Sequence, residues 1–168
     1  MFTALFKKKN SSNFIKTTVM KNFIAVVICL TSFFGLKSQT QNPVTWQATY
    51  KTISATEGEV IITAKIEKGW HTYSQRPTEA GPIPTSFKFV ESKQYQLVGK
   101  TEESNAHEEF VKAFDAKIFV FHDKAEFKQK IKLSGTKGAN IVVNVGFMCC
   151  NDMMCLPPKK IDLTVKAQ

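Results

Sequence analysis

The chain has 168 residues and a formal net charge of +9 at pH 7, from 23 basic and 14 acidic residues. Residues 1–38 hold six of the lysines and no acidic residue, which leaves 17 basic against 14 acidic residues, a net +3, for the rest. The excess charge therefore belongs mostly to the N-terminal segment. Nucleic-acid binding needs basic residues clustered on a folded surface, so we expect no nucleic-acid partner.

A secretory signal peptide is the first segment that the sequence predicts, within residues 1–38. Met20-Lys21-Asn22 is a positively charged start, Phe23–Leu30 is an apolar run, and Ser38 is a small residue before a polar stretch. This order is typical of exported proteins. The apolar stretch, at most Phe23–Leu36, is shorter than the roughly 20 residues of a membrane-spanning helix. We therefore expect cleavage near Ser38–Gln39 and no permanent membrane anchor.

Residues 1–19 stand before a complete signal sequence, so we expect translation to begin at Met20. Acylation of Cys29 is disfavoured, because the residues before it, Val26-Val27-Ile28, are bulky rather than small. The predicted location is therefore the periplasm or the exterior of the cell, after cleavage of the signal peptide. An exported chain enters a compartment where disulfides persist.

Residues 39–168 are predicted to form one all-β domain, because their apolar residues alternate with polar ones. Period-2 alternation is typical of a strand with one wet side. In Ala125–Leu133, Phe127, Gln129 and Ile131 share one face, and the lysines take the other. The other strands predicted in chain order are Val44–Tyr50, Val60–Ile66, Phe87–Val90, Tyr95–Val98, Ile118–Phe121, Ile141–Phe147 and Ile161–Val165.

Turn residues separate these strands, and helical periodicity is nearly absent. A possible helical turn is confined to Ala106–Ala113. Several short strands at this spacing, in a length that suits one domain, indicate an antiparallel β-sandwich. The predicted turns are Glu57-Gly58-Glu59, Lys68-Gly69, Gly81-Pro82, Gly99, Gly135–Gly138 and Pro157-Pro158.

Three clustered cysteines, Cys149, Cys150 and Cys155, are the predicted centre of the chemistry. Because Cys29 leaves with the signal peptide, the mature chain keeps an odd number, which suggests one pair and one spare thiol. Asn151-Asp152 favours a turn that brings Cys155 near Cys150. Two prolines follow, and they stiffen the exit of the loop.

A disulfide across so short a loop adds little stability, because the entropic contribution grows with loop length. Reactivity explains the cluster better: one thiolate attacks a disulfide and a second thiol resolves the mixed intermediate. Two alternatives stay open, a structural disulfide in a non-catalytic binding module and a Cu(I) site. Soft ligands for Cu(I) would be Cys149, Cys150, Met153, Met154 and Cys155.

The sequence favours no cofactor and no other metal site. His107 and His122 belong to no recognisable metal-ligand spacing and are predicted to be solvated loop residues. Glycine-rich phosphate-binding loops and Ser/His/Asp arrangements are also missing from the sequence. Whether the exchange chemistry makes the protein an enzyme, as a protein-disulfide reductase, or a component of an interchange pathway stays open.

Four stretches together resemble a known family: Gly69–Gln75, Gly81–Phe87, Ala125–Ile131 and Cys150–Pro158, the last reading Cys-Asn-Asp-Met-Met-Cys-Leu-Pro-Pro. Over roughly residues 42–166 the chain resembles the N-terminal periplasmic domain of the thiol:disulfide interchange protein DsbD. The Cys…Cys-x-Pro-Pro signature is the most specific part. The resemblance implies an immunoglobulin-like fold with the cysteine pair at the end of a strand hairpin. It also implies electron transfer from a membrane-linked reductant to thioredoxin-like periplasmic oxidoreductases.

The same resemblance implies roles for the sulfurs. Cys155 would attack partners and Cys150 would resolve the mixed disulfide. Cys149 duplicates the first cysteine, and both spacings to Cys155 resemble family members; we favour Cys150, because the Cys-Asn-Asp turn follows it directly. The 168 residues contain no membrane electron channel and no thioredoxin-like domain, so we expect the membrane electron donor to be a separate protein.

Members of this family cover the cysteine pair with a short cap loop that carries an aromatic residue. The matching segment, His107–Phe110, makes Phe110 the expected cap, with Phe114 as the alternative. His71 and Tyr73 match the aromatic pair beside the site. We also expect Glu109 to lie near the cysteine pair. A carboxylate close to Cys155 would raise the pKa of its thiol and slow its unproductive reaction with other thiols.

Overall fold

The computed structural model describes residues 41–79, 81–135 and 138–167. The predicted signal peptide, its cleavage point and the predicted start at Met20 lie outside these ranges. Within them every regular element is a β-strand. None of their segments forms a helix with the length and apolar character needed to cross a membrane. The predicted all-β class is confirmed.

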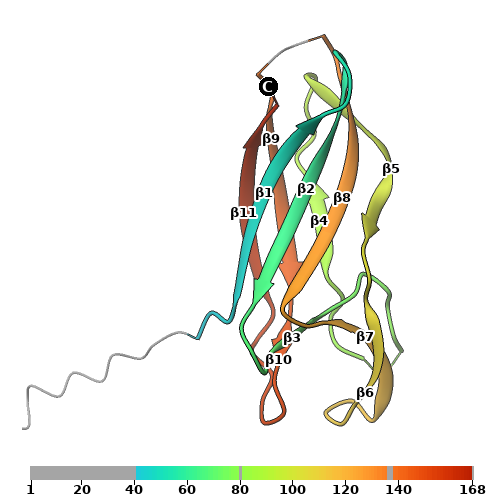
Figure 1. Ribbon diagram of the computed structural model, residues 1–168, viewed down its shortest axis with the longest axis vertical. Coiled ribbons are helices and arrows are strands. Elements are labelled where there is room, and N and C mark those ends of the chain that lie inside the picture. The colour runs from blue at the N-terminus through green and yellow to red at the C-terminus, as the bar shows by residue number, and fades with distance from the viewer. Residues whose placement is uncertain (1–40, 80, 136–137, 168) are drawn as a thin grey trace, which may run out of the picture. The chain divides into compact units, whose positions relative to one another are not determined.

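Eleven strands make up the described part of the domain. Their bounds are β1 Val44–Thr52, β2 Glu57–Ile66, β3 His71–Tyr73, β4 Ser86–Phe89, β5 Tyr95–Glu103, β6 His107–Val111, β7 Ala116–Phe121, β8 Lys124–Leu133, β9 Asn140–Phe147, β10 Cys149–Cys150 and β11 Lys159–Lys166. They form three sheets in the orders β1-β2-β8-β5, β10-β3-β7-β6 and β11-β9-β4 (Figure 1). Neighbouring strands are antiparallel throughout.

The main core lies between the first and third sheets, and alternation along the strands fills it. Phe127 of β8 and Val143 of β9 are fully buried within it. Trp46 of β1 stacks on Phe127 at 5.9 Å and lies 5.2 Å from the ring of Phe147. Each side chain of this size stabilises the fold by about 1.5–3 kcal/mol through burial. This core holds the strands that lead to the cysteine cluster.

Gly58 lies inside β2 rather than in a turn, contrary to the prediction for Glu57-Gly58-Glu59. The ring of Tyr50 covers it: a Cβ atom at Gly58 would lie 2.0 Å from the Tyr50 hydroxyl oxygen. Close approach by a neighbouring side chain therefore explains this glycine. The turn comes earlier, where the Ile53 N–H donates to the carbonyl of Glu57 at 2.9 Å.

A second, smaller hydrophobic cluster lies on the β10-β3-β7-β6 sheet. Its buried members are Tyr73, Val111, Ile118, Val120 and Cys150. Partly buried side chains pack against it, namely Phe114, Ala116, Met148 and Cys155. The cysteine pair therefore belongs to a cluster of its own, separate from the main core.

The strand β6 replaces the possible helical turn at Ala106–Ala113. It pairs with β7 along its whole length, from His107 opposite Val120 to Val111 opposite Ala116. This pairing satisfies the backbone and buries Val111, which a solvated helical turn would not do. A tight connection follows, with Asp115 at a φ of 51°, a conformation that aspartate tolerates better than most residues.

Candidate functional site

A disulfide joins Cys150, at the end of β10, to Cys155 and closes the base of the loop between them. The two Cα atoms are 4.0 Å apart, the sulfurs are 2.02 Å apart, and five positions separate the residues in sequence. Cys155 lies opposite Cys150 in an isolated antiparallel bridge. Figure 1 shows this loop as a narrow hairpin that projects beyond β10 and β3. The structure thus puts the sulfurs at a chain reversal.

Hydrogen bonds close the same loop independently of the sulfurs. The side-chain Oδ1 of Asn151 accepts from the N–H groups of Met153 at 2.9 Å and Met154 at 2.8 Å. The Asn151 N–H donates to the carbonyl of Met154, and the Leu156 N–H donates to that of Cys149, both at 2.9 Å. Asn151 therefore closes the turn as its residue type predicted. None of these four bonds involves a sulfur atom.

Cys149 and Cys150 point to opposite faces of the short strand that they form, as successive residues of a strand do. Cys150 is 1% exposed and belongs to the smaller cluster, whereas Cys149 is 2% exposed and belongs to the main core. Cys149 is a free thiol. Burial raises the pKa of this thiol, against a smaller opposite effect of the positive charge of Lys159.

The three-residue strand β3 brings His71 and Tyr73 to the disulfide. His71 lies directly opposite Cys150 in the antiparallel pairing, and Thr72 lies opposite Cys149. Directly opposed residues place their side chains on the same face with Cβ atoms about 4.5–5.5 Å apart. The hydroxyl of Thr72 also donates to the carbonyl of Met148 at 2.9 Å, which ties the two strands together. His71 therefore shares the face of Cys150.

His71 is a buried histidine with polar neighbours. Its Nε2 lies 3.1 Å from the hydroxyl of Tyr73, and its ring centroid is 5.7 Å from that of His122. Burial lowers the pKa of His71; the charge of Glu109 opposes this, His122 adds to it, and Asp152 opposes it. Its imidazole is therefore neutral near pH 7 and able to accept a proton.

Tyr73 stays a neutral phenol at the same place. Burial raises the pKa of its hydroxyl well above the usual range, and the negative charges of Cys149, as thiolate, and Glu109 raise it further. Its ring lies edge-on to that of Phe114, with centroids 6.1 Å apart. Tyr73 can therefore donate a hydrogen bond beside the sulfurs without carrying charge.

His122 and Glu109 form a polar pair at the outer side of this cluster. The Nε2 of His122 lies 3.0 Å from Oε2 of Glu109, and both side chains are partly exposed. Sequence reasoning predicted a solvated loop residue at His122 and missed its place beside His71. No local pattern indicates this place, because the two residues are 13 positions apart and come from β6 and from the segment after β7.

Phe114 packs against the smaller cluster that contains Cys150, whereas Phe110 is exposed. Phe110 lies on the outer face of β6 and is 56% exposed, because its neighbour Val111 takes the inner face of the strand. Phe114 lies in the β6–β7 connection, where its N–H donates to the carbonyl of Val111 at 3.0 Å. Its ring packs against the cluster that contains Cys150. The first choice of cap residue from the sequence is therefore largely exposed to solvent.

Two other features could bind ligands. Met153, 89% exposed, and Met154 lie at the tip of the disulfide loop. Among the described residues, no group of three or more His, Cys, Asp or Glu side chains could hold a metal ion.

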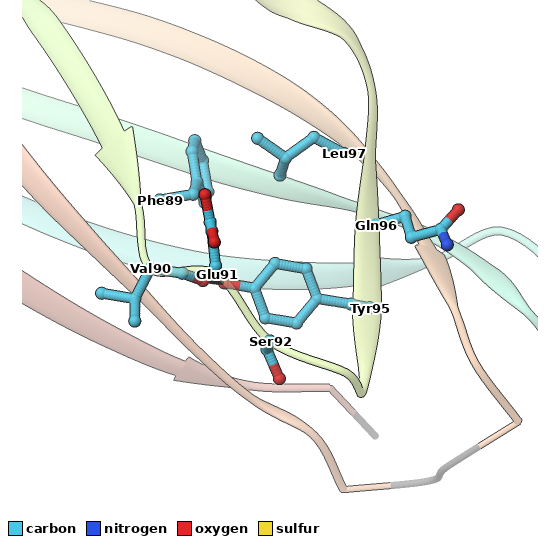
Figure 2. Close-up of a pocket in the computed structure, with 7 residues that line it drawn as sticks. All are labelled: Phe89, Val90, Glu91, Ser92, Tyr95, Gln96 and Leu97. Atoms are coloured by element: carbon cyan, nitrogen blue, oxygen red, sulfur yellow. Dashed lines mark hydrogen bonds between the residues drawn. The ribbon is translucent and has the colours of Figure 1, made fainter.

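A cavity of about 360 Å³ lies at the start of β5, toward the end of the sandwich opposite the disulfide loop (Figures 1 and 2). It is lined by Phe89, Val90, Glu91, Ser92, Tyr95, Gln96 and Leu97.

Comparison with known proteins identifies relatives of the chain. A family model described as "Thiol:disulfide interchange protein DsbD, N-terminal" matches residues 39–167. Proteins with curated functions give no match.

Two solved structures share the fold. The reduced N-terminal domain of DsbD from Neisseria meningitidis is 15% identical, with a TM-score of 0.50, and the match covers 76% of this chain and 90% of that one. The N-terminal periplasmic domain of ScsB from Proteus mirabilis is 17% identical, with a TM-score of 0.54, and the match covers 77% of this chain and 48% of that one. The predicted immunoglobulin-like antiparallel β-sandwich is confirmed.

Proposed function

We propose a function from one premise: the chain belongs to the family of the N-terminal domain of the thiol:disulfide interchange protein DsbD. The protein is an exported thiol–disulfide exchange module whose Cys150 and Cys155 alternate between dithiol and disulfide. It relays two electrons from a membrane-linked donor, a separate protein, to thioredoxin-like oxidoreductases in the periplasm. The relay needs no cofactor, because the sulfurs themselves carry the electrons.

The observation that carries this proposal is the unequal burial of the two bonded sulfurs. Cys150 is 1% exposed, whereas Cys155 is only partly buried. Exchange requires a sulfur that another protein's thiolate can reach. Cys155 is therefore the sulfur that forms the mixed disulfide, and Cys150 is the thiol that resolves it.

The reduced module transfers two electrons to an oxidised partner in two steps. The Cys155 thiolate attacks one sulfur of the partner's disulfide, which forms a mixed disulfide and releases one partner thiolate. The Cys150 thiol loses its proton and attacks the sulfur of Cys155, which releases the second partner thiolate. The module ends as the Cys150–Cys155 disulfide, and the partner has gained two electrons as two thiolates, which take up protons from the solvent.

A protein that carries reducing equivalents needs to avoid idle exchange with small molecules. We assign this protection to Phe114, whose ring packs against the cluster of Cys150 and Cys155. The β6–β7 connection that carries Phe114 is short and surface-exposed, so a docking partner could displace it. Glu109 adds negative charge to the surroundings of the site, since it raises the pKa of both His71 and Tyr73.

Trapping the mixed disulfide in cells tests the function. Cys150→Ala removes the resolving thiol, so we expect a thioredoxin-like protein to remain bound to Cys155 through a bond that dithiothreitol cleaves. Non-reducing electrophoresis and mass spectrometry of the purified adduct would identify it. Cys155→Ala is the matched control, because it removes the attacking thiol while it leaves Cys150 in place, and it should trap nothing.

The structural alternative makes the opposite prediction. If the disulfide only closes the loop of a binding module, Cys150→Ala would trap no more protein than Cys155→Ala. Equal adducts in the two variants would also contradict the assigned order of attack. Either result would remove the electron-relay proposal.

A further inference from the structure

The proposed exchange leaves one proton without a destination. In its second step Cys150 has to become a thiolate, yet its side chain is 1% exposed and lies among apolar residues. Burial disfavours a lone thiolate. Water has little access to the Cys150 sulfur, so a neighbouring side chain has to accept the proton.

His71 is the basic group that the fold places beside Cys150. The two residues are directly opposed in the β10–β3 pairing, so their side chains share a face. Burial of His71 favours the neutral imidazole, which is the form that accepts a proton. Nε2 lies 3.1 Å from the Tyr73 hydroxyl, and this contact orients the ring.

Two partly exposed polar side chains lie near His71, toward solvent. The His122 ring lies 5.7 Å from that of His71, and Nε2 of His122 lies 3.0 Å from Oε2 of Glu109. Both of these side chains are partly exposed. The charged groups that act on His71 come from three elements: Glu109 of β6, His122 after β7, and Asp152 of the disulfide loop. The two carboxylates favour a positive charge on His71, and His122 opposes it.

We propose that His71 accepts the proton of the Cys150 thiol during the second step of exchange, and that His122 and Glu109 pass this proton to water. The inference rests on the proposed function. His71 is then a catalytic residue, and His122 and Glu109 are positioning residues. A thiolate beside an imidazolium is a neutral pair overall, which burial penalises less than a lone thiolate.

The second step of exchange then includes one proton transfer, from Cys150 to His71. The Cys150 S–H bond breaks as His71 gains the proton, and the Cys150 thiolate then attacks the sulfur of Cys155. The Cys150–Cys155 bond forms, the bond from Cys155 to the partner sulfur breaks, and the partner leaves as a thiolate. His71 returns to its neutral form when its proton moves through His122 to water.

The small disulfide dithiodipyridine separates the two steps, because each releases one coloured thiopyridone. Attack by Cys155 on the reagent releases the first, and attack by Cys150 on the sulfur of Cys155 releases the second. The reduced full chain is mixed with an equimolar amount, and release is followed in a stopped-flow spectrometer from pH 6 to pH 9. Acid-quenched samples analysed by mass spectrometry show the mixed disulfide directly.

We expect His71→Gln to slow the second release by about tenfold or more at pH 7, since each unit of pKa increase lowers the thiolate fraction tenfold. The first release should stay within about twofold of wild type. As the pH is raised, the rate of the second release by the wild type should level off. At the same pH, the rate of the second release by His71→Gln should still rise about tenfold per pH unit. His71→Phe should behave in the same way, and circular dichroism should show that both variants are folded.

The matched control is His107→Gln, at an exposed histidine of β6, which should keep the wild-type rates of both steps. His122→Gln should slow the second step less than His71→Gln. Wild-type second-step rates in both folded His71 variants would overturn the inference while the proposed function stood. A wild-type chain that shows neither release would overturn the proposed function instead.

Discussion

Cys149 and Cys150 are adjacent in the chain, yet the fold gives their sulfurs different environments. The side chain of Cys149 lies in the main core, where burial raises the pKa of its thiol. Cys150 lies in the smaller cluster and is bonded to Cys155. A neutral, buried thiol reacts slowly. We therefore propose that Cys149 is a core residue and takes no part in exchange.

The contact of Phe114 with the cysteine cluster gives a prediction about protection. Phe114→Ala should raise the rate at which dithiothreitol reduces the oxidised protein, by up to about tenfold, because an aromatic contact is worth about 0.5–1.5 kcal/mol. Reduction can be followed by alkylating the new thiols at timed intervals. The ring contact with Tyr73 at 6.1 Å is the interaction that this change removes.

Phe110→Ala is the matched control for this experiment. It removes the same ring from the same hairpin, at a position that is 56% exposed, so the rate of reduction should stay within about twofold of wild type. Faster reduction of this variant than of Phe114→Ala would restore the assignment made from the sequence. If dithiothreitol reduced both variants at the wild-type rate, the protective role proposed for Phe114 would be contradicted.

At the scale of elements, the short strand β3 depends on its neighbours for its position. Its backbone pairs with β10 on one side and with β7 on the other. Glu103 of β5 holds the segment that follows: its carboxylate accepts from the Ser74 hydroxyl at 2.6 Å and from the Gln75 N–H at 2.8 Å. Arg76 adds an ion pair at 3.2 Å to the same carboxylate.

Removing that carboxylate should destabilise the domain. Glu103→Ala leaves the buried Ser74 hydroxyl and the Gln75 N–H without their partner, and a hydrogen bond to a charged group contributes about 1.5–3 kcal/mol. We expect the free energy of unfolding to fall by about 2 kcal/mol, measured by urea denaturation. The rate of the second thiopyridone release should also fall, because Glu103 helps to hold β3, which carries His71.

Its neighbour Glu102 supplies the control. The Glu102 side chain is 70% exposed and meets Lys130 at 3.8 Å, and exposed ion pairs contribute about 0–1 kcal/mol. Glu102→Ala should therefore change the free energy of unfolding by less than about 0.5 kcal/mol. A similar loss in both variants would show that Glu103 does not anchor β3.

The long strands were predictable because one face of each is buried. Ala125–Leu133 is the clearest case: Phe127, Gln129 and Ile131 are all buried, as the alternation predicted. Gln129 is a polar member of that face because its amide has partners, including the Thr101 hydroxyl at 2.8 Å. Alternation was a reliable guide wherever a sheet faces the main core.

The shorter strands β6 and β10 were not predicted. β10 has too few residues for a period to be detected, and three of the five residues of β6 are polar and come first, without alternation. β10 pairs with β3 across more than 70 positions, while β6 owes its extended backbone to β7. Local residue preferences at 106–113 suggested a helical turn, and pairing with β7 outweighed them.

At the scale of the whole molecule, the disulfide is separate from the source of stability. The main core contains Cys149 but neither of the bonded cysteines. Hydrogen bonds that involve Asn151 and Leu156, and no sulfur atom, also close the loop. A module that cycles between two oxidation states needs this separation, because it has to remain folded in both.

Reduction should therefore leave the domain folded. With a sequence separation of 5 between the cysteines, the chain-entropy contribution of the disulfide is about 2 kcal/mol or less. Urea denaturation with and without dithiothreitol should show two cooperative transitions that differ by no more than this. Complete unfolding on reduction would instead support a structural disulfide and contradict the relay.

The amino-acid sequence by itself determined the all-β class, the long strands, the Asn151 turn and the cysteine cluster. Each of these follows from short-range patterns, because alternation and turn preferences act over a few residues. Only the tertiary structure decided which cysteines are bonded, which phenylalanine packs against the cluster of Cys150, and that His71, His122 and Glu109 lie together. These depend on the pairings of β3 with β10 and with β7, which join residues far apart in the chain, and on the β6–β7 hairpin, whose first strand shows no local pattern.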